Sequence, residues 1–517
     1  NPSFLFNTKI EGVFNQMKKL IDKLFNTKVS TSYMFILFGV SALMLAGYFS
    51  YAWFTVQGVQ QYSVVTGTLN GTVAIGTNSV AINGQGVITY TPTTDNDIIT
   101  LTVTNTNDRT VKNSIYYYNL SDSSIEIGYT SDSPTVPSTQ GVSVAQGKTL
   151  TYKIKIKNAK GKQIKIGSSM GLNNSNLTLP SGTTAFSLLK DPTGAEVLVA
   201  KANPEDLDYN TATADQKNQM WTFSHEATEQ LGATTDYRYI GANPNNYVKF
   251  NDELWRIIGV FDTDDGTGKI EKRMKIIRNE SIGTYSWDNK YELYSTPYGE
   301  NNWQDARLNY LLNSGHESET YGGSLYWNRK SGTCYKGQYN GTISCDFTSI
   351  GLTEETKKMI GDAKWYLGGT TEYDNSSNGL AKHFYSYERG TNVYSGRSTN
   401  WTGKVGLIYL SDYGYATSGN SSTTRATCLT KELYNWDTVS ACYQNDWLSP
   451  ENQVKKWSIS PDSYYTSYVF IINSGVVRDS DAYNSDHDVY PVVYLKSTIN
   501  ITSGTGSSTD PFILAQS

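Results

Sequence analysis

The feature that most constrains this chain is a long apolar run near its N-terminus. Residues 33–54 read YMFILFGVSALMLAGYFSYAWF and contain no Asp, Glu, Lys or Arg. At a helical rise of ~1.5 Å per residue, the run is long enough to cross a hydrocarbon core of ~30 Å. Tyr33 and Trp53 lie near its ends, where aromatic rings suit the membrane interfaces, and Phe38 and Leu43 lie within it. We predict a transmembrane helix at residues 31–54.

The charges on either side of this run predict its orientation. Lysines precede it in excess over acidic residues, and no Lys or Arg follows it before Arg109. Positive charge collects on the cytoplasmic side of membrane helices. We therefore expect a single-pass protein of the cell membrane whose N-terminus is cytoplasmic and whose bulk is extracellular. A cleavable signal peptide fits less well, because the run lies far from the start and no A-x-A site follows.

Residues 1–30 form a basic segment with apolar residues at helical spacing. One interpretation is an amphipathic helix lying on the inner leaflet. The other is a helix that packs against copies of itself, as in the core of an extracellular filament. The second interpretation draws on the absence of any charge between Lys28 and Asp95, since an uncharged stretch is cheap to bury between subunits.

The rest of the composition favours β structure on a cell surface. The chain has 39 Tyr and 11 Trp among 517 residues, in a background of Thr, Ser, Asn and Gly that favours strands and turns. Its net charge is −5 without basic blocks, so nucleic acid is not an expected partner. At ~100–200 residues per domain, several domains are expected.

Residues 55–189 are predicted to form a β-sandwich stalk. Ile99, Leu101 and Val103 alternate with Thr, and the run from Leu150 to Ile156 alternates in the same way. Such alternation is typical of half-buried antiparallel strands. The stretch VAQGKTLTYKIKIKN resembles a strand region of bacterial immunoglobulin-like surface modules, which implies an immunoglobulin-like sandwich. A smaller β unit is a further expectation for residues 64–90.

Residues 190–237 are more polar and are predicted to be a linker that includes a short helix. The run HEATE begins at His225 and Glu226 but lacks the second His of a zinc-protease helix, so we reject a zinc site there.

Residues 238–517 are predicted to be a distal α+β domain. Strands are expected on either side of a turn at Asn251 and Asp252 and again in MKIIRNESIG, with helices in NNWQDARLNYLLN and in LTEETKKMIGDAKW. Thr353 is the expected N-cap of the second helix. The loop at residues 262–266 looks like the start of a calcium loop but lacks the later Glu, which favours a hairpin turn.

Four motifs in this domain carry a family resemblance. They are WRIIG at residues 255–259, WQDARLN at 303–309, WSISP at 457–461 and YPVVYLK at 490–496. In this order they resemble an uncharacterised domain on surface proteins of gut Firmicutes, which looks C-type-lectin-like. The resemblance implies a bacterial source and a C-type-lectin-like fold for the distal domain. The Glu-Pro-Asn and Gln-Pro-Asp triplets of calcium-dependent sugar binding are absent.

The four cysteines fall into two local pairs, Cys334 with Cys345 and Cys428 with Cys442. The pairing favours two disulfide-closed loops in an oxidising compartment. A zinc site is the rival interpretation, but the short Cys-x-x-Cys spacing that it needs is missing.

Two groups of residues are candidates for binding. Asp479, Asp481, Asp486 and Asp488 are the densest cluster of oxygen ligands, and they indicate either a calcium site or a solvated acidic loop. Aromatic residues in polar loops suit ligand recognition, although core packing is the competing role of each ring. These candidates are Tyr373, Tyr385, Tyr387, Tyr394, Trp401, Tyr464, Tyr465 and Tyr483.

The sequence therefore favours a membrane-anchored bacterial surface adhesin or receptor-binding protein that recognises a protein or glycan. The alternative is a structural subunit of an extracellular filament or surface layer, built by self-assembly around the N-terminal helix. An enzyme is not expected, because no nucleophile elbow and no phosphate-binding glycine loop occurs in the chain. No cofactor other than calcium is indicated.

Overall fold

The computed structural model describes residues 15–19, 22–23, 39–42, 44, 69–291, 299–375, 377–448 and 454–516. Two compact units divide the chain, Asn1–Lys190 and Asp191–Ser517, and its regular structure is mainly β. Within the described residues, no helix is both long and apolar enough to cross a membrane. Helices were predicted at residues 1–30 and 31–54, and most of both segments lies outside the described residues. Tyr33, Phe38, Leu43 and Trp53 lie outside them as well.

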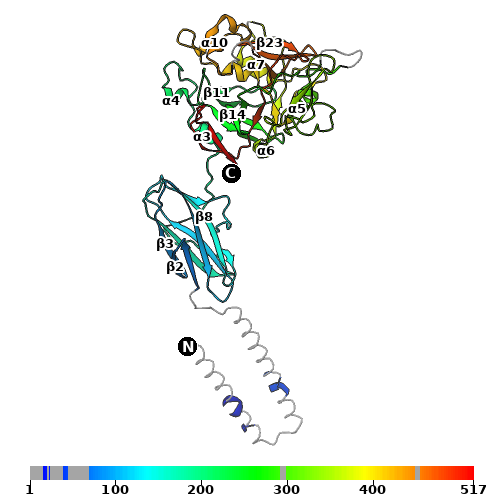
Figure 1. The fold of residues 1–517 in the computed structure, drawn as a ribbon. Coiled ribbons are helices and arrows are strands. Elements are labelled where there is room, and N and C mark those ends of the chain that lie inside the picture. The colour runs from blue at the N-terminus through cyan, green and yellow to red at the C-terminus, as the bar shows by residue number, and fades with distance from the viewer. Residues whose placement is uncertain are drawn as a thin grey trace. The chain divides into compact units, whose positions relative to one another are not determined.

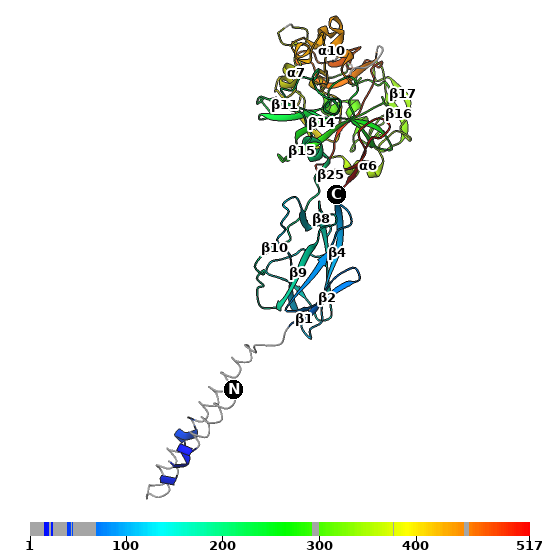
Figure 2. The same cartoon turned by 90° about the vertical axis from the view of Figure 1, so that its left-hand side faces the viewer.

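The first unit contains one continuous antiparallel sheet that folds around a core (Figures 1 and 2). The sheet runs in the order β10-β5-β9-β3-β2-β1-β4-β8-β6, and β7 pairs with β5. Its strands are β1 (Asn70–Ile75), β2 (Asn78–Asn83), β3 (Gln85–Tyr90), β4 (Asn96–Asn105), β5 (Val111–Tyr118), β6 (Glu126–Tyr129), β7 (Val142–Val144), β8 (Thr149–Lys157), β9 (Ile164–Leu172) and β10 (Thr183–Ala185).

The predicted alternation of β4 and β8 builds this core. Ile99 pairs with Ile154 and Leu101 with Tyr152, and all four side chains are buried. Side chains of one strand alternate between the two faces of a sheet, so the threonines of β4 point away from the core. Strands β1 to β3 do not form a separate unit, since β1 pairs with β4 and β3 with β9. Their apolar side chains complete the same core.

The second unit contains a larger sheet in the order β20-β24-β15-β14-β13-β26-β25, with β11 attached through β12 to β14. Smaller sheets pair β16 with β17, β18 with β19, and β21 with β22 and β23. The strands are β11 (Trp221–His225), β12 (Thr234–Arg238), β13 (Tyr247–Phe250), β14 (Glu253–Asp264), β15 (Ile270–Arg278), β16 (Ser331–Tyr335), β17 (Thr342–Asp346), β18 (Ala363–Tyr366), β19 (Asn400–Gly403), β20 (Val405–Gly406), β21 (Lys455–Pro461), β22 (Tyr468–Asn473), β23 (Val476–Asp481), β24 (Val492–Tyr494), β25 (Ile499–Ser503) and β26 (Phe512–Gln516).

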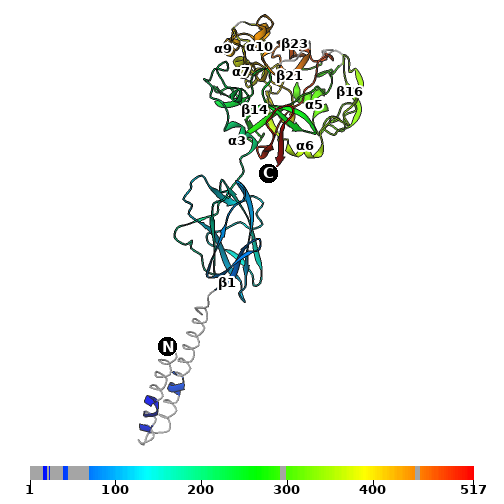
Figure 3. The same ribbon diagram turned by 60° about the vertical axis from the view of Figure 1, so that its left-hand side comes forward.

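Short helices surround these sheets (Figures 1 and 3). They are α3 (Gly194–Val199), α4 (Ala214–Lys217), η1 (Trp303–Asp305), α5 (Arg307–Leu312), α6 (Glu354–Met359), α7 (Ala381–Glu388), α8 (Leu410–Tyr415), α9 (Arg425–Leu429), η2 (Leu433–Thr438) and α10 (Ser440–Gln444). Tryptophans fill much of the core between helices and sheets, with Trp255, Trp287, Trp303, Trp365, Trp436 and Trp457 fully buried.

Several local predictions are confirmed in this unit. Asn251 and Asp252 form the turn between β13 and β14, and both have positive φ (59° and 61°), as a two-residue hairpin turn requires. The loop at residues 262–266 belongs to the β14–β15 hairpin, where Asp264 accepts backbone hydrogen bonds from Gly266 and Gly268. Thr353 caps α6, which is shorter than predicted because residues 363–366 form strand β18 instead.

The segment expected as a linker, residues 190–237, belongs to the second unit from Asp191 onward. Ala195 and Leu198 of α3 are buried in its main core, and β11 and β12 extend the larger sheet. Thr193 and Glu196 form a reciprocal capping box at the start of α3. Polar composition concealed the spaced apolar residues that pack this segment against the sheet.

Both predicted disulfides are present. Cys334 bonds Cys345 across the β16–β17 hairpin, and Cys428 bonds Cys442, which ties α9 to α10. Both bonds close short loops, and the described residues contain no free cysteine.

The neighbouring residues Ile98 and Ile99 of β4 offer a matched test of the first core. Ile99 is 4 % exposed and Ile98 is 58 % exposed. We expect Ile99→Ala to lower the free energy of unfolding of this unit by ~2–5 kcal/mol, because it opens a cavity. Ile98→Ala should cost less than about 1 kcal/mol. Denaturant unfolding of the full chain measures both, and equal losses would contradict this core.

Candidate functional site

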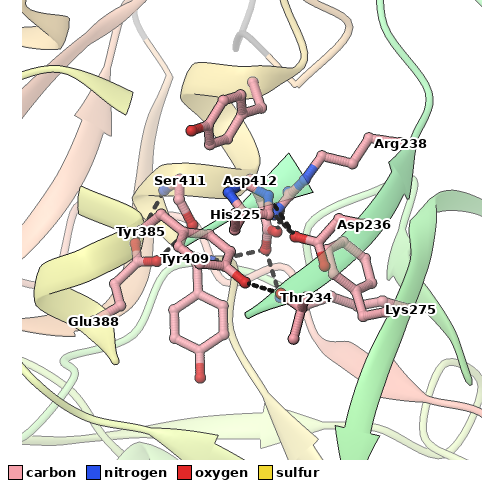
Figure 4. Close-up of polar contacts among 12 residues, drawn as sticks. His225, Thr234, Asp236, Arg238, Lys275, Tyr385, Glu388, Tyr409, Ser411 and Asp412 are labelled. Atoms are coloured by element: carbon pink, nitrogen blue, oxygen red, sulfur yellow. Dashed lines mark hydrogen bonds and ion pairs between the residues drawn. The ribbon is translucent and has the colours of Figure 1, made fainter. Parts of the chain in front are cut away.

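A network of buried charges lies at the centre of the second unit (Figure 4). Asp412 of α8 accepts hydrogen bonds from Arg238 of β12 at 2.8 Å and from Lys275 of β15 at 2.5 Å. Arg238 also donates to Asp236 of the same strand at 2.8 Å. The side chains of all four residues are at most 3 % exposed. The network therefore joins two strands of the larger sheet to α8 by charge pairs that water does not reach.

The network continues through His225 and α7. His225 Nε2 lies 3.0 Å from Asp236 Oδ2, and the imidazole stacks on the Tyr385 ring at a centroid distance of 3.7 Å. The Tyr385 hydroxyl in turn contacts Thr234 Oγ1 at 2.8 Å. These contacts hold α7 against β11 and β12.

A third acidic side chain fixes α7 to α8. Glu388 accepts hydrogen bonds from the Ser411 amide at 2.9 Å and from the Ser411 hydroxyl at 2.5 Å. Arg389 Nη1 lies 3.2 Å from the same carboxylate. The Arg389 guanidinium also lies over the Tyr385 ring, 3.6 Å from its centroid. Each buried anion of this cluster therefore has a cation or a hydroxyl beside it.

The pKa values of the network follow from burial and from these pairs. Burial acts to raise the pKa of Asp236, but the Arg238 guanidinium and His225 outweigh it and hold the pKa at about 2. The pKa of Asp412 is lowered in the same way, against burial, by Lys275 and Arg238. Burial lowers the pKa of Lys275 to about 8 although Asp412 opposes the shift. Burial also lowers the pKa of His225. At neutral pH, the imidazole is therefore neutral and the two carboxylates are charged.

A pocket opens beside this network. Its volume is about 220 Å³, and it is lined by Glu205, Phe223, Ser224, His225, Lys382, Tyr415, Arg425 and Leu429. His225 thus contacts both the buried network and the pocket. None of these residues except His225 stood out in the sequence, because they come from segments far apart in the chain.

Most of the predicted recognition aromatics have structural contacts. Tyr385 belongs to the buried network, and Tyr373 donates its hydroxyl to Asp479 at 2.9 Å. Trp401 packs edge-on against Trp303, and its strand β19 pairs with β18. Tyr387 and Tyr483 are half-buried.

Two predicted tyrosines are well exposed and lie next to each other. Tyr464 is 67 % exposed and Tyr465 is 52 % exposed, and their ring centroids are 5.0 Å apart. Tyr468, which sequence analysis did not select, adds a third ring 5.0 Å from Tyr465. We call these three residues the tyrosine surface.

Hydrogen bonds from buried residues hold the tyrosine surface in place. Asp462 accepts the amides of Tyr464 and Tyr465 at 2.7 and 2.8 Å. The Asn301 side chain donates to the carbonyls of Asp462, Tyr465 and Tyr468 at 2.8–2.9 Å. The backbone under these exposed rings is therefore well fixed.

A small hollow lies next to the tyrosine surface and contains the predicted residue Tyr394. Asp462, Trp303, Arg397 and Asn301 line it as well. Arg397 pairs with Glu300 at 2.9 Å. Tyr394 is thus the third predicted recognition residue that the fold brings to this part of the surface.

The carboxylates considered as a calcium site or a solvated acidic loop are not grouped around a common centre. Across the described residues, no group of three or more His, Cys, Asp or Glu is placed to hold a metal ion. Asp479 accepts from Tyr373 and Asp481 from Ser467, whereas Asp486 pairs with Lys455 at 2.6 Å. The β22–β23 hairpin and the following loop place these three carboxylates against different partners, which closeness in sequence could not reveal.

Asp236 provides a test of the buried network. Its folded pKa of about 2 is below the ~3.9 of an unfolded chain, so its charge stabilises the fold above pH ~4, and this contribution is lost as the pH falls towards 2. We expect Asp236→Asn to lower the free energy of unfolding of the second unit by ~3–5 kcal/mol at pH 7. The loss should shrink near pH 3.

The matched control is Asp362→Asn, which removes the exposed ion pair with Lys404. It should change the free energy of unfolding by less than about 1 kcal/mol at either pH. Denaturant titrations at pH 7 and pH 3 measure both variants. A loss for Asp236→Asn that is the same at the two pH values would contradict the network.

In comparisons with known proteins, no protein-family model, curated protein or solved structure matches the chain.

Proposed function

We propose that this chain is a bacterial cell-surface recognition protein, an adhesin or receptor-binding protein, whose second unit binds a protein or glycan. The proposal includes the N-terminal transmembrane anchor and the first unit as a stalk. The observation that carries it is the tyrosine surface, where Tyr464 and Tyr465 are exposed on a backbone fixed by Asn301. Rigid aromatic area beside polar groups is what binding surfaces use, because little conformational entropy is lost on contact.

Carboxylates border the tyrosine surface and indicate the chemistry of its ligand. Asp481 raises the pKa of Tyr468 through its negative charge, and Asp479 acts in the same direction. A ligand with hydroxyl or amine donors next to an apolar face would meet both the acceptors and the rings. Glycans have this combination, and so do basic, flexible peptide segments.

The stalk proposal rests on strand order. The order β1-β4-β8-β6 corresponds to strands A, B, E and D of an immunoglobulin-like sandwich, and β5 and β9 correspond to C and F. The position of strand G, next to F, is occupied by β3, which precedes the B strand in this chain. We propose a variant immunoglobulin-like module in which an N-terminal hairpin completes the second layer.

The C-type-lectin-like interpretation of the second unit also remains a proposal. Its four motifs fall on elements of the core: WRIIG lies in β14, WQDARLN in η1 and α5, WSISP in β21, and YPVVYLK includes β24. These motifs therefore specify how the unit packs, and the exposed loops between them are free to carry the binding residues.

A filament or surface-layer subunit is the second candidate function. It is favoured by the uncharged stretch between Lys28 and Asp95, which a single stalked protein does not require. In this case the N-terminal helices would lie in the core of an assembly and the second unit would be displayed on its outside.

The tyrosine surface can be tested by truncating its rings. We expect Tyr464→Ala combined with Tyr465→Ala to weaken binding to the natural ligand by about tenfold or more, because exposed aromatic residues dominate such contacts. Tyr339→Ala removes an equally exposed ring (58 %) elsewhere in the unit and serves as control. The full chain is applied to a glycan array and to immobilised surface proteins. If both variants bind as the wild type does, the tyrosine surface is not the binding site.

The two candidate functions differ in what lies on the cell surface. Electron microscopy of cells and of sheared material, with an antibody to residues 240–517, separates them. For a single-molecule adhesin, we expect diffuse label that detergent releases. Regular labelled filaments would instead identify a structural subunit.

A further inference from the structure

The pocket beside the buried network contains two cations for which the described part of the chain provides no ion pair. Arg425 and Lys382 line it, and among the described residues no carboxylate lies within ion-pair distance of either. Glu205 is the one acidic side chain in the lining, and it accepts a hydrogen bond from the Ser224 amide at 3.1 Å. The pocket therefore has an excess of positive charge.

Arg425 is poorly satisfied by the protein itself. A guanidinium has five N–H donors, but the hydrogen bond given for this one is a long contact of 3.4 Å from Nη2 to the Tyr415 carbonyl. Its Nε is buried and has no acceptor in the described part of the chain. Burial lowers the pKa of Arg425 to about 10, so it is still charged at neutral pH. Arg425 as a whole is half-buried, but its buried Nε leaves one donor without an acceptor, which costs free energy unless a partner joins it.

The other arginines around this cluster form ion pairs with carboxylates. Arg238 has carboxylates at 2.8 Å on both sides, and Arg389 has Glu388 at 3.2 Å. Arg425 has instead the face of Phe223, 4.5 Å from the ring centroid. Stacking on an aromatic ring orients a guanidinium and leaves its edge free for a bidentate contact.

The walls of the pocket are apolar and firmly held. Phe223 and Tyr415 belong to one hydrophobic cluster with Trp221 and Tyr385, and Leu429 packs against it. Next to Leu429, the Cys428–Cys442 disulfide ties α9 to α10. A ligand would thus meet a preformed aromatic wall and a fixed guanidinium. The volume of about 220 Å³ is below the ~300–1,000 Å³ of pockets that take a whole drug-sized molecule, so it suits one terminal residue of a larger ligand.

We propose that this pocket binds a carboxylate-bearing terminal residue, with the carboxylate on Arg425, the exposed Lys382 at the rim, and the ring or side chain against Phe223 and Tyr415. Two sources share this chemistry: an acidic sugar at the end of a glycan and the free C-terminus of a peptide. The site is separate from the tyrosine surface and does not depend on the function proposed for it.

Saturation-transfer NMR on the full chain tests the proposal with two matched pairs of probes. Glucuronate is compared with glucose, and an acetylated tripeptide acid with its amide. We expect one acid to bind at least tenfold more tightly than its neutral partner, and the pair that responds identifies the source. If neither acid exceeds its neutral partner, or if inorganic phosphate binds and both acids do not, the proposal is overturned.

Variants assign the bound acid to the pocket. Arg425→Gln should weaken binding by about 10- to 100-fold, the usual effect of losing a hydrogen bond to a charged group. Because Arg425 is partly buried, the exposed Lys382→Gln provides a second variant that leaves the core intact, with an expected loss of about two- to fivefold. Lys358→Gln, on exposed α6, is the control.

Tyr464→Ala should leave acid binding unchanged, which separates this site from the tyrosine surface. If Lys382→Gln and folded Arg425→Gln both bind the acid as the wild type does, the pocket is not its site.

Discussion

The second unit depends on one buried carboxylate. Asp412 accepts from Arg238 and Lys275, which are 174 and 137 positions away in the chain. Removing three charged side chains from water costs free energy. The attraction between these charges offsets that cost only if they are held at close distance. The position of α8 relative to β12 and β15 is therefore fixed by the requirement that these groups stay within hydrogen-bonding distance. An apolar contact at the same place would tolerate small shifts, whereas this one does not.

Other features of the unit follow from that constraint. Once α8 is fixed, Ser411 places Glu388 and with it α7, and α7 presents Tyr385 to His225. The polar groups needed for this chain of contacts are all supplied by the protein. We interpret the network as the frame of the unit.

Local patterns were the part of this fold that could be predicted. The alternation of Ile99 and Leu101 with threonine is read directly from neighbours in sequence, and so are the turn at Asn251 and the cap at Thr353. The buried network could not be predicted, because nothing near Asp236 or Lys275 marks its distant partner. The tyrosines show the same limit. Tyr385 and Tyr464 both lie in polar, aromatic segments, but packing of α7 against β11 buries one ring and leaves the other in solvent.

The arginines of the second unit connect its stability with its binding chemistry. Arg238 and Arg389 form ion pairs with carboxylates of the chain, and these pairs hold strands and helices together. Arg425 is close enough to Glu205 to be attracted by it and to Arg238 to be repelled, but among the described residues no carboxylate is in ion-pair range of it. Glu205 lines the same pocket but does not contact the guanidinium as an ion pair. A preoriented cation therefore lies at the edge of the pocket, where an acidic ligand can pair with it.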